Sequence, residues 1–205
     1  MAFVAIDPLN LIRIIPAEGR KTETKPKQDS TRITPAKIVP TRILAEGAVL
    51  VALSGALHLV TFYQAPLGGR VTAGAMIPVL LFALRRGYVL GTAAGAAYGL
   101  IVMIEEPFLF HPVQVLLDYF IAFGILGVAG FFRKAPLVGV VVAMAGRFAS
   151  HFASGVIFAE IFIPEGADAV VFSAVYNGQY LLPELVISAI IVQVLVRLKT
   201  LELYL

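Results

Sequence analysis

Six long apolar runs, separated by short polar breaks, make up the chain from Thr41 onward. Their approximate bounds are 42–62, 71–84, 87–105, 112–132, 136–162 and 177–198. A helix needs about 20 apolar residues to cross a bilayer, so runs of this length are typical of membrane-spanning helices. The second run is short for a crossing, and Gly68 and Gly69 before it favour a re-entrant or irregular approach. The pattern predicts an all-α integral membrane protein, a bundle of six transmembrane helices.

The charged residues between the runs sort by sign. Basic residues mark one set of alternate ends, and they are Arg85, Arg86, Arg133, Lys134, Arg197 and Lys199. Acidic residues mark the opposite ends, and they are Glu105, Glu106, Glu160, Glu165 and Asp168. Because Lys and Arg are retained in the cytoplasm, we expect both termini inside and the loops at 63–70, 105–111 and 160–176 outside. The net charge of +3 then reflects membrane topology, and we expect a lipid bilayer, not nucleic acid, as the partner.

The first 40 residues differ from the rest of the chain. Eight of the 16 basic residues lie before residue 43, and residues 17–40 are rich in Pro, Lys, Thr and Glu without an aromatic residue. Such a segment cannot bury enough apolar surface to offset the entropy cost of ordering. We therefore expect two parts: residues 1–40 form a polar, basic extension, cytoplasmic and partly disordered, and residues 41–205 form the six-helix transmembrane domain.

Residue types that carry catalysis are scarce. The chain has no Cys, which excludes thiol nucleophiles and thiolate metal ligands. His58, His111 and His151 lack the spacing of metal ligands, and the sequence contains no Walker A motif. We expect a protein that is not an enzyme and holds no metal or cofactor. Uphill transport by such a chain must draw on an ion gradient or on a partner ATPase.

A few polar side chains fall inside the apolar runs, where an ionised group costs a few kcal/mol unless it has a partner. Asp118 lies in the fourth run, Arg147 and His151 share one face of the fifth, and Asn177 opens the sixth. With the expected topology, Asp118, His151 and Asn177 all lie in the outer half of the membrane. Polar groups that converge in an apolar wall are typical of a small-molecule site.

Structural alternatives exist for each of these residues. Arg147 and Asp118 could form an ion pair that locks two helices, and His151 could be a hydrogen-bonded core residue. Asn177 could cap the sixth helix. A membrane enzyme that uses Asp118 and His151 as an acid–base pair is a further alternative.

Small residues recur on one face of the first run. Ala48, Ala52 and Ala56 are spaced four residues apart, so they form a smooth stripe along a helix. Another helix can approach such a stripe closely, which favours association where the hydrophobic effect is absent. The partner helix could belong to this chain or to another protein.

Four segments of the sequence carry a family resemblance. They are MIPVLLFALRRG (76–87), HPVQVLLDYFIAFGILGVAGFFR (111–133), RFASHFASGVIF (147–158) and FSAVYNGQYLLP (172–183). Together they resemble the ThiT family, the thiamine-specific substrate-binding (S) components of energy-coupling factor (ECF) transporters. The HPVQ-x-LLDY and YN-x-x-Y-x-x-P blocks are specific, and the likeness runs from about Thr41 to Lys199.

The resemblance implies an S-component fold and a subunit that binds thiamine tightly from outside the cell. Such a subunit has no ATPase of its own, and it associates with a transmembrane coupling subunit and two ATPase subunits. Transport is understood as toppling of the whole subunit, driven by ATP hydrolysis in the partner. The stripe of Ala48, Ala52 and Ala56 resembles the family's docking surface. An S component for another heteroaromatic vitamin or cationic nutrient is the alternative.

The resemblance also implies a set of ligand contacts. Eight residues match, and they are Asp118, Tyr119, His151, Gly155, Asn177, Tyr98, Phe108 and Phe172. Asp118 is expected to supply the counter-charge or accept a hydrogen bond from the pyrimidine edge of thiamine, while His151 stacks and Asn177 hydrogen-bonds. The aromatic residues would form walls around the thiazolium. Some members stack the ligand on Trp residues; this chain has no Trp, and Gly69 and Ala159 take those positions.

Overall fold

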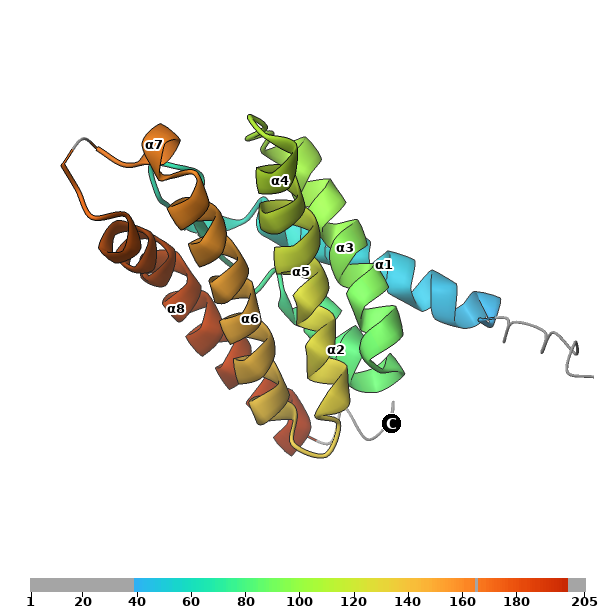
Figure 1. Ribbon diagram of the computed structural model, residues 1–205. Coiled ribbons are helices and arrows are strands. Elements are labelled where there is room, and N and C mark those ends of the chain that lie inside the picture. The colour runs from blue at the N-terminus through green and yellow to red at the C-terminus, as the bar shows by residue number, and fades with distance from the viewer. Residues whose placement is uncertain (1–38, 165, 199–205) are drawn as a thin grey trace, which may run out of the picture. The chain divides into compact units, whose positions relative to one another are not determined.

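The structure, a computed structural model, describes residues 39–164 and 166–198. The predicted amino-terminal extension therefore lies almost entirely outside the described residues. Within the described ranges, five helical spans are long and apolar enough to cross a membrane (Figure 1). They are α1 (Thr41–His58), α3 (Tyr88–Glu105), a composite span (Pro112–Phe131), α6 (Pro136–Ile157) and α8 (Ala169–Arg197). This architecture confirms the predicted class, a mostly helical integral membrane protein.

The composite span consists of four consecutive helical segments. They are α4 (Pro112–Val115), the π-helix η1 (Leu116–Ile121), α5 (Ala122–Gly124) and the 3-10 helix η2 (Ile125–Phe131). π-helical turns are rare, and they occur frequently at functional sites. Here the π-helical turn carries Asp118 and Tyr119, two of the predicted ligand contacts.

The second predicted run, 71–84, is not a long helix. Two antiparallel strands, β1 (Thr61–Gln64) and β2 (Arg70–Thr72), form a hairpin, and the ten-residue helix α2 (Ile77–Arg86) follows. At 1.5 Å per residue, α2 is only about 15 Å long, half the thickness of the hydrocarbon core. Gly74 has a φ of 83°, a backbone conformation that favours glycine. This residue therefore separates strand β2 from helix α2. The predicted count of six transmembrane helices is thus not confirmed. The irregular approach that Gly68 and Gly69 favour takes the form of a small hairpin before a short helix.

The last helix also differs from the prediction, because α8 begins at Ala169 and not at residue 177. The side chain of Asp168 caps its amino end by accepting a hydrogen bond of 2.8 Å from the Val171 N–H. Asn177 lies more than two turns inside the helix. The alternative that Asn177 caps this helix is therefore wrong.

Helix packing is closest between α3 and the composite span, which in turn packs against α6; α8 packs on the other side of α6 (Figure 1). Gly95 and Gly99 of α3 lie against the backbone carbonyls of Phe123 and Tyr119. A Cβ atom at either glycine would overlap these carbonyls. Small residues let backbones approach closely where lipid removes the hydrophobic driving force. The glycines thereby fix the position of the π-helical turn.

The basic ends of the helices are held together by charged side chains. Glu46 of α1 pairs with Arg85, at 2.6 Å, and with Arg86 of α2. Arg133 donates hydrogen bonds to the carbonyls of Leu84, at 3.1 Å, and Arg85, at 2.8 Å. These basic residues therefore gather at one end of the bundle, as the charge pattern predicts.

The close contact between Gly99 and the Tyr119 carbonyl leads to a testable prediction. Gly99→Val forces α3 away from the Tyr119 carbonyl, and we expect it to lower the free energy of unfolding by about 1–3 kcal/mol, the usual cost of overpacking. The melting temperature of the purified protein in detergent measures this effect. Ala97→Val is the matched control, because Ala97 lies on the exposed face of the same helix. Equal melting temperatures for the two variants would contradict the close packing.

Candidate ligand-binding site

A cavity of about 430 Å³ lies among the hairpin, α3, the composite span, α6 and α8. Its size falls in the range of small-molecule sites. All eight residues that the resemblance assigns to the ligand line this cavity, namely Tyr98, Phe108, Asp118, Tyr119, His151, Gly155, Phe172 and Asn177. The structure thus brings together residues that lie as far as 79 positions apart in the sequence (98 to 177). Their contact with a ligand stays a prediction.

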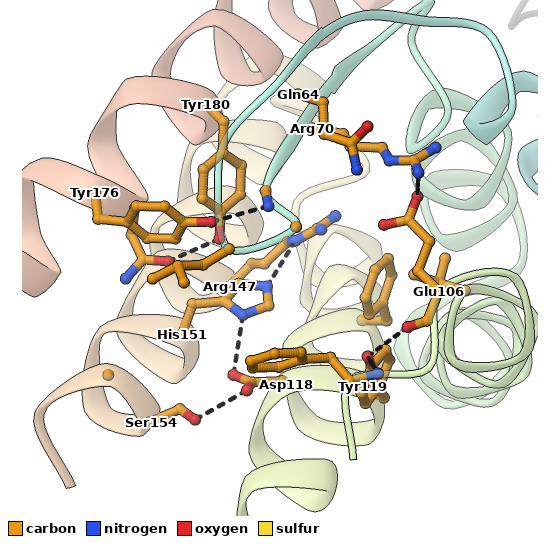
Figure 2. A pocket seen from close by; sticks show the side chains of 18 of the residues that line it. Gln64, Arg70, Glu106, Asp118, Tyr119, Arg147, His151, Ser154, Tyr176 and Tyr180 are labelled. Carbon is orange, nitrogen blue, oxygen red and sulfur yellow. Dashed lines mark hydrogen bonds and ion pairs between the residues drawn. The ribbon is translucent and has the colours of Figure 1, made fainter. Parts of the chain in front are cut away.

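Asp118 is the most closely held of these side chains (Figure 2). Its carboxylate accepts hydrogen bonds from Gln114 Nε2 at 2.8 Å and Ser154 Oγ at 2.9 Å. His151 Nδ1 lies 3.1 Å from the other carboxylate oxygen. Gln114 is one helical turn before Asp118, whereas Ser154 and His151 come from α6. Two spans therefore converge on one carboxylate, which keeps its orientation toward the cavity.

His151 connects Asp118 to Arg147 (Figure 2). Arg147 Nε donates to His151 Nε2 over 3.4 Å, so Nε2 accepts and the ring proton resides on Nδ1, which donates to Asp118. The Arg147 guanidinium also donates to Met76 Sδ at 2.7 Å and lies 4.0 Å from the centre of the Phe123 ring. Within the described part of the chain, Arg147 and Asp118 form no direct ion pair, because His151 lies between them.

Asn177 is 4% exposed and is largely satisfied by its own helix. Its Nδ2 donates to the Ser173 carbonyl at 2.9 Å and to Ser173 Oγ at 3.2 Å, and its Oδ1 accepts from Tyr180 at 2.7 Å. A carbonyl oxygen has two acceptor positions. Asn177 therefore keeps one acceptor position for a further hydrogen bond. Gly155 faces Ser173 so closely that a Cβ would overlap its hydroxyl, which explains a glycine at this crossing of α6 and α8.

Aromatic rings form much of the cavity wall. Phe172 and Tyr176 stack with their planes 1° apart, and Tyr176 meets Tyr180 edge-on. Sequence reasoning did not select Tyr176 and Tyr180, although their four-residue spacing from Phe172 places all three on one face of α8. The ring of Tyr180 occupies the space that any side chain at residue 69 would need. An aromatic ring from α8 thus packs at the position where the resemblance suggested an absent Trp.

The hairpin is bound to the helices around the cavity. Tyr176 accepts a hydrogen bond of 3.0 Å from the Gly69 N–H. Glu184 of α8, which is 0% exposed, accepts hydrogen bonds from the backbone N–H and the hydroxyl of Thr72. Glu184 thus holds strand β2 against α8.

A second polar wall was not identified from the sequence. His58 ends α1, Arg70 lies in β2 and Glu106 follows α3, and all three line the cavity. Arg70 forms an ion pair with Glu106, while His58 Nδ1 lies 3.1 Å from the Tyr98 hydroxyl. Tyr119 also bonds to the carbonyl of Glu106 at 2.8 Å. In the sequence, the acidic break at 105–106 has an ordinary interpretation as membrane topology.

Over residues 39–164 and 166–198, the structure contains no group of three His, Cys, Asp or Glu side chains that could hold a metal ion. The geometry is that of a binding cavity, with a fixed carboxylate and aromatic walls.

Comparison with known proteins places this geometry in a family. The model of the family described as "Thiamine transporter protein (Thia_YuaJ)" matches residues 44–203. The thiamine transporter ThiT of Bacillus subtilis (strain 168) is 36% identical over 167 residues, which cover 72% of this chain and 86% of that protein. The thiamine transporter ThiT of Lacticaseibacillus paracasei is 27% identical over 173 residues, which cover 75% and 86%.

A solved structure of ThiT from Listeria monocytogenes shares the fold. It superimposes with a TM-score of 0.70 at 24% identity and covers 78% of this chain and 96% of the Listeria chain. Together with the five apolar spans, the relatives indicate a multi-pass protein of the cell membrane. The family match over residues 44–203 and the 36% identity to the Bacillus transporter show that this chain belongs to the thiamine transporter family.

Proposed function

We propose that this chain is the thiamine-binding S component of an ECF-type importer, a subunit that acts by binding and not by chemistry. The observation that supports this most directly is the Asp118 carboxylate, which three side chains hold in place at the wall of an aromatic-lined cavity. Thiamine is a flat cation with an aminopyrimidine ring that donates and accepts hydrogen bonds. A fixed anion among aromatic rings suits both features.

Asp118 supplies the charge and the hydrogen-bond acceptor in this proposal. An ionised carboxylate has about four lone-pair positions, and its protein partners occupy three of them. The remaining position accepts from the amino group of the pyrimidine, and the negative charge balances the thiazolium. Because three donors already orient the carboxylate, little further ordering is needed when the ligand binds.

The aromatic residues provide the rest of the proposed site. Tyr98, Tyr119, Phe108 and Phe172 line the cavity, and each ring face can attract the thiazolium. A cation–π contact of this kind contributes about 0.5–2 kcal/mol. His151 stacks against the ligand in this arrangement. Several such contacts around one cation support high affinity.

The alanine stripe of α1 supports a partner. Ala48, Ala52 and Ala56 are all exposed, whereas Val51 and Ser54 of the same helix are buried against the bundle. The sequence left open whether the helix that packs on this stripe belongs to this chain. No described residue of this chain covers the stripe. We place the transmembrane coupling subunit there, with its two ATPases, and ATP hydrolysis in that complex topples this subunit to deliver thiamine inward.

The charge distribution sets the orientation in this proposal. The basic end that Glu46, Arg85 and Arg133 hold together faces the cytoplasm. Both termini then lie inside, and the cavity opens toward the exterior. The amino-terminal residues 1–40, which precede the transmembrane domain 41–205, form a cytoplasmic extension.

Calorimetric titration of the purified chain tests the binding function. We expect saturable binding of one thiamine per chain, because the residues proposed to contact the ligand converge on one carboxylate, that of Asp118. Binding of a different vitamin in place of thiamine would support the alternative S component, and turnover of a ligand by the isolated chain would support the acid–base alternative.

Removal of the counter-charge makes a second prediction. Asp118→Asn keeps the shape but loses the charge, and we expect thiamine binding to weaken by about 1–3 kcal/mol, the cost of losing a charged hydrogen bond. Asp168→Asn is the matched control, since Asp168 is exposed, lies outside the cavity and sits at a helix cap where Asn serves equally well. If Asp118→Asn lowered the melting temperature and left the affinity unchanged, Asp118 would have a structural role alone.

The docking surface makes a third prediction. Ala52→Trp places a large ring on the smooth stripe, and we expect it to abolish thiamine uptake by cells while thiamine affinity in detergent stays unchanged. Ala145→Trp is the control, because Ala145 is exposed on α6, a different helix. Normal uptake by the Ala52→Trp variant would refute the docking role of α1.

A further inference from the structure

A pair of aromatic rings at the basic end of the bundle takes no part in the cavity. Tyr88 is the first residue of α3, and Phe131 is the last residue of η2. Their rings stack with centres 4.2 Å apart and planes 15° apart. Neither ring lines the cavity, so the proposed ligand does not explain the pair.

The backbone around this pair is closely packed. A Cβ atom at Gly130 would overlap the backbone nitrogen of Tyr88 and the carbonyl oxygen of Ala83, so only glycine fits there. Arg133 then donates hydrogen bonds to two carbonyls in the last turn of α2, at 3.1 and 2.8 Å. The end of α2, the start of α3 and the end of η2 are therefore held as one corner, which presents the two rings in a fixed position.

The rings are exposed at the ends of membrane spans. Tyr88 is 48% exposed and Phe131 is 62% exposed. One begins the apolar span of α3, and the other ends the composite span. Aromatic rings at the ends of transmembrane helices lie at the level of the lipid headgroups. The pair therefore lies where the headgroup of a phospholipid joins its acyl chains.

Basic side chains surround the aromatic pair. Glu46 is shared between Arg85 and Arg86, so one carboxylate faces two guanidinium groups. Lys134 is exposed and forms no ion pair within residues 39–164 and 166–198. Arg133 is also exposed, and its bonds to α2 use two of the five donors of a guanidinium. Positive charge and free N–H donors thus remain beside the rings.

A phosphodiester in the membrane suits this corner better than an acidic protein segment. Its oxygens can accept from several donors at once, and the attached glycerol and acyl carbons can pack on the exposed rings. Basic groups between helices at the cytoplasmic side of a membrane bind anionic lipid headgroups in this way. A zwitterionic headgroup brings its own cation, which the excess of positive charge disfavours.

We propose that Tyr88, Phe131, Arg133 and Lys134 form a binding site for the headgroup of an anionic phospholipid. The phosphate accepts hydrogen bonds from the Lys134 ammonium and the Arg133 guanidinium, and the glycerol end of the acyl chains packs on the stacked rings. A lipid bound there anchors this end of the bundle at a fixed depth. The site is separate from the cavity and does not depend on thiamine binding.

Native mass spectrometry of the full chain tests this site. The protein is released from detergent micelles that contain equal amounts of phosphatidylglycerol and phosphatidylcholine, and we expect it to retain phosphatidylglycerol in preference. Lys134→Gln removes one cation near the headgroup, and we expect the ratio of retained phosphatidylglycerol to phosphatidylcholine to fall about fivefold. Tyr88→Ala removes the stack, so it should lower the retention of both lipids and leave their ratio unchanged.

Arg197→Gln is the matched control, because Arg197 is an exposed basic residue at the end of α8, outside the corner. This variant should keep the ratio of the unmodified protein. An equal fall in Arg197→Gln and Lys134→Gln would show general attraction to positive charge and overturn the site. Equal retention of the two lipids by the unmodified protein, an unchanged ratio in Lys134→Gln, or unchanged lipid retention in Tyr88→Ala would overturn it as well.

Discussion

A carboxylate inside a membrane must receive its hydrogen bonds from protein, because lipid offers none. Asp118 meets this requirement through Gln114 on its own span and through Ser154 and His151 on α6. These bonds tie the composite span to α6 and turn the carboxylate toward the cavity. His151 in turn accepts a hydrogen bond from Arg147. The Arg147 guanidinium is itself held by Met76 and by the ring of Phe123. The polar wall of the cavity is thus also the connection between its helices.

The same constraint explains the hairpin and the half-length helix. Irregular backbone within the membrane is tolerated only where protein satisfies its polar groups. The hairpin strands bond to each other, Glu184 accepts from the N–H of Thr72, and Tyr176 accepts from the N–H of Gly69. α8 therefore supplies the partners that make the irregular segment possible. In return, the hairpin brings Arg70 to the cavity, which a continuous second helix would not do.

Much of the candidate site could be predicted from the sequence, because polar residues within apolar runs are few. Asp118, His151 and Asn177 stood out for this reason, and the structure places all three at one cavity. Tyr176 and Tyr180 did not stand out, since aromatic residues on a membrane helix are equally common at lipid-facing positions. His58 and Glu106 were at the ends of runs, where a polar residue has an ordinary explanation in the membrane interface. Only the approach of α1, β2 and α3 to one another gives these residues a common environment.

The sequence alone determined that the chain spans a membrane, how its charges divide between two ends, and which helix faces carry polar groups. These properties follow from local composition and spacing, because transfer into lipid acts on each segment almost independently. Tertiary structure decided that the second run breaks into β1, β2 and α2, that η1 is π-helical, and that His151 separates Arg147 from Asp118. These features depend on contacts between segments distant in the chain, such as Gly99 against Tyr119 and Thr72 against Glu184. Their energies arise only when the helices pack, and no single segment contains them.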